Sequence, residues 1–163
     1  MKAMGKSAGA FFLLVTMIAA DASFGSMRKL ELRDLTVQAT HVITGTVLSV
    51  VSGWTNEGAI ETKVRIHVEN YLMGSFGDGS VDLTIPGGEV GGIGLAVSDM
   101  PHFVKGTRVL LFLAIQDVHS PTVVGLHQGK FTLQKGKVVE TGFGETEFLR
   151  LVQAEIRAKQ EAK

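Results

Sequence analysis

A metal ion is the first chemistry to consider, because Asp117, His119 and His127 carry the carboxylate and imidazole groups that zinc accepts as ligands. A zinc ion with an open coordination position would activate water for hydrolysis. The three residues would have to converge across a hairpin, and Asp99 with His102 is a second, smaller combination. The histidines show no H-x-x-x-H pair, whereas metal ligands normally cluster more closely. We therefore expect solvated loop histidines and no metal or other cofactor, with a metal-binding protein or metal-dependent hydrolase as the alternative.

Nucleophilic catalysis has less support in the sequence. The chain has no cysteine, which excludes thiol chemistry and cysteine-ligated metal. A G-x-S-x-G pattern occurs once, from Gly5 to Gly9, but this segment is not the strand-to-helix turn that exposes a catalytic serine. Nothing in the sequence specifies a nucleophile, a base and an orienting group together. We expect a protein that is not an enzyme.

The segment IPGGEVGGIGLAV, residues 85–97, contains five glycines and no lysine or arginine. It lacks the G-x-G-x-x-G spacing and the Gly-Lys-Ser/Thr ending of phosphate-binding loops, and a proline follows it where such a loop would open a helix. Nucleotide binding is therefore not expected. Two interpretations stay open. The glycines allow turns and close backbone approach while Val90, Ile93, Leu95 and Val97 still pack, or the segment is a shaped loop that receives a partner peptide.

If the glycine segment binds a partner, we expect these residues to do so: Trp54, Glu89, Gly91, Gly92 and Ile93. Trp54 is the single tryptophan and lies in the turn cluster of residues 52–58. Its ring either covers one end of the fold or is exposed, and an exposed tryptophan is a typical anchor of an interface. The sequence does not separate these two roles.

The first residues have the layout of a secretory signal peptide. Lys2 and Lys6 precede an apolar run of eleven residues, 10–20, and Ala20 and Ala22 then bracket Asp21. This run is too short to span a membrane, which needs about 20 apolar residues. We expect cleavage after residue 22 and export to the periplasm or the cell exterior, with membrane contact only during export.

The mature chain, residues 23–163, is then one domain. Removal of residues 1–22 lowers the 16 basic and 16 acidic residues to 14 and 15. This near-neutral balance indicates neither nucleic acid nor an anionic membrane as a partner.

Hydrophobic patterns predict a mainly β domain. Residues 41–51 are rich in β-branched side chains, residues 61–69 alternate apolar with charged residues, and residues 81–85 resume the alternation. Residues 107–116 are apolar on both faces and predict a central strand, with two or three short strands following. A short helix is expected within residues 27–40. A C-terminal helix, about 145–162, is expected to bury Phe148, Leu151, Val152 and Ile156. The fold class is an OB-like antiparallel β-barrel with these two helices, or alternatively a β-sandwich.

Two resemblances follow from these segments. The P-G-G-E-x-G-G loop at residues 86–92 and the G-x-x-V-L-L-F-L strand at 106–113 resemble a family of small secreted bacterial proteins, over roughly residues 30–133. That family implies no activity. The strand pattern is also distantly similar to the OB-type barrel of the tissue inhibitors of metalloproteinases and of netrin-like modules. Those inhibitors ligate the protease zinc through an N-terminal cysteine, so only the barrel shape is implied here.

Together these observations predict a secreted or periplasmic binding protein that engages a protein or peptide partner through the glycine-rich loop. The metal-dependent alternative would use Asp117, His119 and His127. A structural envelope component without a dedicated partner site is a further alternative. The charged side chains of Lys63, Arg65 and His67 on the alternating strand are expected to face solvent.

Overall fold

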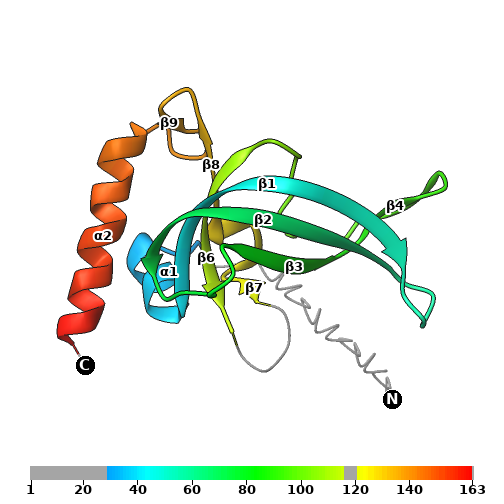
Figure 1. Ribbon diagram of the computed structural model, residues 1–163, viewed down its shortest axis with the longest axis horizontal. Coiled ribbons are helices and arrows are strands. Elements are labelled where there is room, and N and C mark those ends of the chain that lie inside the picture. Colours follow the sequence, from blue (N-terminus) through cyan, green and yellow to red (C-terminus); the bar gives the residue numbers. More distant parts are fainter. Residues whose placement is uncertain (1–28, 116–120, 163) are drawn as a thin grey trace, which may run out of the picture.

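The computed structural model describes residues 29–115 and 121–162 (Figure 1). The expected signal peptide and two of the metal candidates, Asp117 and His119, lie outside these residues. Among the described residues, no helix is long and apolar enough to cross a membrane.

The short N-terminal helix is confirmed as α1 (Leu32–Gln38). Its first turn is closed by a capping box, in which the backbone N–H of Glu31 donates to the Asp34 carboxylate at 3.2 Å. The helix ends at Ala39, where the backbone becomes extended and leads into the first strand. Leu35 is buried, so the helix attaches to the sheet by one face.

The main sheet is antiparallel and has seven strands, in the order β3-β2-β1-β6-β8-β9 with β7 beside β6. Its strands are β1 (His41–Trp54), β2 (Ile60–Met73), β3 (Ser80–Pro86), β6 (Arg108–Ala114), β7 (Thr122–Val123), β8 (Lys130–Gln134) and β9 (Lys137–Val138). A 3-10 turn, η1 (Leu126–Gly129), precedes β8. The mainly β antiparallel fold with two helices is confirmed. The sheet is not closed into a barrel, because the order ends at β3 on one side and at β9 on the other.

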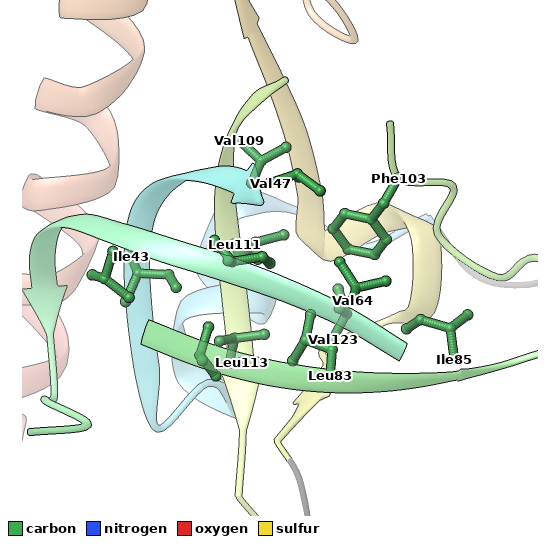
Figure 2. Close-up of a cluster of buried hydrophobic side chains, with 13 residues drawn as sticks. Ile43, Val47, Val64, Leu83, Ile85, Phe103, Val109, Leu111, Leu113 and Val123 are labelled. Carbon is green, nitrogen blue, oxygen red and sulfur yellow. The ribbon is translucent and has the colours of Figure 1, made fainter. Parts of the chain in front are cut away.

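Strand β6 has a hydrophobic core on each face, as its two-sided apolar sequence predicts. Val109, Leu111 and Leu113 face a core made with β1, β2 and β3, which Figure 2 shows with Phe103 lying over Val64. Leu110 and Phe112 face the second core, which includes buried residues of both helices. A strand buried on both faces is what a continuous apolar run requires.

The C-terminal helix is confirmed as α2 (Glu145–Glu161) and covers the second core. Phe148, Val152 and Ile156 are buried at a spacing of four residues. The expectation for Leu151 is wrong, because its side chain is 43 % exposed. A helix that contacts its neighbours along a narrow i, i+4 stripe leaves the i+3 position at the rim.

Two expectations around the glycine segment also change. Strand β1 continues three residues beyond the predicted Val51 and includes Trp54, so the turn is shorter than residues 52–58. The glycine segment is not an irregular loop, because it forms a small antiparallel sheet of β4 (Gly88–Val90) and β5 (Ile93–Leu95). We refer to residues 88–95 as the β4–β5 hairpin. It projects from the end of the molecule opposite α2 (Figure 1).

Candidate binding hairpin and hollow

The base of the β4–β5 hairpin is fastened to β2 by hydrogen bonds. The backbone N–H of Gly87 donates to the carbonyl of Ile60 at 2.8 Å, and the Thr62 hydroxyl donates to the carbonyl of Gly87 at 2.6 Å. The hydroxyls of Ser52 and Thr62 lie 2.9 Å apart beside these bonds. Gly88 sits directly over this pair of hydroxyls, where a side chain would overlap them. The base is therefore a close backbone crossing that only glycine allows.

The tip of the hairpin is a two-residue turn. Val90 pairs with Ile93, and the intervening Gly91 and Gly92 have φ values of 59° and 81°. Two successive positive φ angles are those of a type I′ turn, which matches the twist of a tight hairpin. A Cβ at either position would meet no neighbouring atom, so these two glycines serve the turn and not a close contact.

Most apolar side chains of the glycine segment are exposed. Ile93 is 58 % exposed, Leu95 is 42 % exposed and Val97, which follows the hairpin, is 38 % exposed. Of the two interpretations left open for this segment, packing is realised only in part, because Val90 is half-buried whereas the other three apolar side chains are exposed. Three apolar side chains close together in the sequence are thus available to another molecule.

A hollow of about 580 Å³ lies between the hairpin and the main sheet. We name it the hairpin hollow. Val64, Ile85 and Phe103 form part of its wall and also belong to the first core (Figure 2). Glu89 is the only Lys, Arg, Asp or Glu among its lining residues. The complete lining is Val50, Ser52, Thr62, Val64, Ile85, Pro86, Gly87, Gly88, Glu89, Gly94, Leu95, Ala96, Val97, Met100, Pro101, His102 and Phe103.

Trp54 lies at the last position of β1, opposite Ile60. It shares a strand face with Ser52, because alternate residues of a strand point to the same side. Its side chain is 51 % exposed, whereas Ile60 is buried. The structure therefore places Trp54 beside the base of the hairpin, with half of its surface open.

The histidines form a different arrangement from those expected. Asp99, which follows the hairpin, accepts a hydrogen bond at its carbonyl oxygen from the backbone N–H of His127 at 3.0 Å, and the His127 Nδ1 lies 3.2 Å from the same oxygen. His102 and His127 both line a second hollow of about 310 Å³. Within residues 29–115 and 121–162, no three His, Asp or Glu side chains are grouped so that they could hold a metal ion.

The charged strand face is more ordered than expected. Arg65 donates two hydrogen bonds of 2.7 Å to the carboxylate of Asp82 on the neighbouring strand. The Arg65 hydrogen bonds hold the pKa of Asp82 below its usual value. Both side chains are 58 % exposed, so we expect this pair to contribute little to stability.

A second polar network joins three strands to α2, on another part of the molecule. Glu69 accepts hydrogen bonds from Thr46 at 2.6 Å and from Arg108 at 3.0 Å, and Arg108 also binds Glu145 at 3.1 Å. Burial acts to raise the pKa of Glu69, but the hydrogen bonds and the Arg108 charge outweigh burial and leave the pKa lowered. The network is a structural clamp between the sheet and the start of α2.

Replacing Glu69 with glutamine should lower the free energy of unfolding at pH 7 by about 0.5–1 kcal/mol. Because the pKa of Glu69 is lower in the folded protein, its stabilising effect is complete above the unfolded pKa of about 4.3. The effect disappears as the pH falls below that value and through the folded pKa. Urea denaturation of both proteins between pH 7 and pH 3 would measure this. A difference that stays constant down to pH 3 would contradict an ionic role.

The site thus combines a rigid hairpin base, an exposed apolar hairpin, a mainly apolar hollow and a half-exposed tryptophan. The residues predicted from the sequence, which are Trp54, Glu89, Gly91, Gly92 and Ile93, all lie at this candidate site, whereas Leu95 and the hollow were not predicted as parts of it. Leu95 and Val97 were visible in the sequence as apolar residues that pack under one of the two open interpretations. In comparisons with known proteins, no family model, no curated protein and no solved structure matches this chain.

Proposed function

We propose that this protein is a non-enzymatic binding protein that engages a protein or peptide partner through the β4–β5 hairpin. The observation that carries this proposal is the exposure of Ile93 and Leu95 on the hairpin, and of Val97 directly after it, beside an apolar hollow. Exposed apolar groups beside a concave apolar surface are typical of interaction sites. Trp54 supplies an aromatic anchor at the edge of this surface.

The construction of the hairpin supports a recognition role. Its base is held by hydrogen bonds to Ile60 and Thr62, while β5 pairs only with β4 among the described strands. A fixed base with an exposed tip presents side chains at little conformational cost, which favours binding.

The proposal extends to the type of β-sheet fold and to the export of the protein. Strand β1 pairs with β2 along its length, with register shifts, and with β6 over residues 41–46, as a strand shared by the two sides of a curled OB-type sheet would. We propose an open relative of that barrel, in the family of small secreted proteins that carry the P-G-G-E-x-G-G loop. The apolar run and the A-x-A pattern support export and removal of residues 1–22.

Replacing Ile93 with aspartate should weaken partner binding more than tenfold, because it places a charge in the centre of the apolar surface. The matched control is Val139→Asp, since Val139 is 57 % exposed and Ile93 is 58 % exposed, but Val139 follows β9. Charged residues at Gly91 or Gly92 would strain the turn, so they are poorer variants.

The measurement is capture from the envelope and culture fluid with residues 23–163 as bait, followed by titration of the captured partner. We expect a partner that the native and Val139→Asp proteins retain and the Ile93→Asp protein loses. Equal capture by all three folded proteins would remove the hairpin from the function and favour a structural envelope component.

A further inference from the structure

We infer that the partner of the β4–β5 hairpin is an extended peptide segment in which a lysine or arginine stands beside an apolar residue. This inference rests on the proposed function and adds the chemistry of the partner. Three features of the hairpin support it: a bare strand edge, the apolar hollow and a local surplus of negative charge.

The bare edge is the outer side of β5. In a hairpin with a two-residue turn, the closing pair Val90–Ile93 is hydrogen-bonded and the next pair, Glu89–Gly94, is not. The backbone N–H and C=O of Gly94 therefore point away from β4. No backbone hydrogen bond joins residues 91–98 to the main sheet in the described part of the chain. An extended peptide would satisfy these groups by adding as a third strand.

Natural edge strands are normally protected from such pairing by charged residues, proline or a covering element. Residues 91–98, GGIGLAVS, contain neither a charged residue nor proline, and residues 91–98 are all exposed. A Cβ at Gly94 would contact only a carbonyl oxygen at 4.0 Å, so the face of the hairpin is also open at this position. The edge thus has the properties of a site for β-strand addition.

The hollow determines one side chain of the partner. An added strand points alternate side chains to opposite faces, so one of them would face the hollow that Gly94 and Leu95 line. A volume of about 580 Å³ accommodates a large apolar side chain, and walls such as Phe103 and Ile85 favour one.

The negative charge at this end of the molecule predicts the residue that stands next to the apolar side chain in the partner. Residues 50–62 and 85–104, at this end of the molecule, contain four carboxylates and no lysine or arginine: Glu57, Glu61, Glu89 and Asp99. Glu61 is paired with Lys63, whose Nζ lies 3.9 Å from its carboxylate, so the local surplus of negative charge rests on Glu57, Glu89 and Asp99. Glu89 lines the hollow itself. Electrostatic complementarity therefore favours a cationic segment.

The test uses a random heptapeptide library displayed on phage and selected on the protein of residues 23–163. We expect the selected peptides to be enriched in sequences with Lys or Arg next to Leu, Ile, Val or Phe. Calorimetric titration of the corresponding synthetic peptides should show binding about threefold to fivefold weaker with Glu89→Gln. Glu147→Gln, on the exposed surface of α2, should leave binding unchanged. The Glu89→Lys protein should bind these peptides more than tenfold more weakly. Its affinity should recover when the peptide lysine is replaced by glutamate.

The outcomes separate this inference from the proposed function. Peptides that depend on Ile93 but show no cationic preference and no response to Glu89→Gln would overturn the inference and leave the binding role intact. A library without any enriched peptide would overturn both. Self-association in sedimentation experiments that Ile93→Asp abolishes would identify a second copy as the occupant and overturn the inference.

Discussion

Replacing Phe112 with alanine should lower the free energy of unfolding by about 3–5 kcal/mol. Phe112 is fully buried on β6 and faces the core between the sheet and the helices. Its ring contacts the Phe131 ring edge-on, with centroids 6.0 Å apart. Removal of the ring leaves a cavity under α2, and a domain with a total stability of about 5–15 kcal/mol would lose a large part of it.

The measurement is urea denaturation followed by circular dichroism, with Phe112→Leu as a control that keeps much of the apolar volume. The leucine variant should lose less than half as much stability as the alanine variant. Val104→Ala, at a position that is 55 % exposed, should change stability by less than about 0.5 kcal/mol. A loss below about 1 kcal/mol for Phe112→Ala would contradict tight packing of the helices on β6.

Replacing Gly88 with alanine should detach the β4–β5 hairpin and cost about 2–3 kcal/mol. Gly88 has a φ of 135°, and an added Cβ would overlap the hydroxyls of Ser52 and Thr62 and approach the Ser52 Cβ to 2.9 Å. Thr62 has little freedom to rotate away, because it is β-branched and its hydroxyl donates to Gly87. The base of the hairpin would have to move, and with it the binding surface.

Gly53→Ala is the matched control, since Gly53 lies on the adjacent strand and a Cβ there meets nothing within 4 Å. We expect its stability to remain within about 0.5 kcal/mol of the native protein. Hydrogen exchange at the amides of residues 88–95 reports the hairpin directly. It should accelerate strongly in Gly88→Ala and stay unchanged in Gly53→Ala. Unchanged exchange in both variants would show that the base tolerates a side chain.

The main elements follow from local periodicity. The alternation at residues 61–69 predicted β2, and the two-sided apolar run predicted a central β6. Such patterns reflect burial of one or both faces of a strand, so they can be recognised in the sequence without knowing which strands lie beside it. Leu151 was wrongly assigned to the buried stripe because the width of a helix contact depends on the surface beneath it.

The candidate site was predictable in part. The glycine segment and Trp54 were identified from their residue types, and the structure brings them to one end of the molecule. The pairing of Asp99 with His127 was not predictable, because 28 residues separate them and no periodic pattern connects them. The hollow was equally hidden, since its walls come from five strands and from the segment after β5.

By itself, the sequence determined the strand and helix content of this protein, its cysteine-free chemistry and the need for glycine at the turns. Those properties depend on side-chain type and on short-range spacing. Only the tertiary structure decided that Ile93, Leu95 and Val97 are exposed while Val64 and Ile85 are covered. All five are apolar, and their burial depends on whether another part of the chain reaches them. The hydrogen bonds of Gly87 fix the base of the hairpin on β2, whereas no backbone hydrogen bond joins residues 91–98 to the main sheet in the described part of the chain, and this leaves an apolar strand accessible.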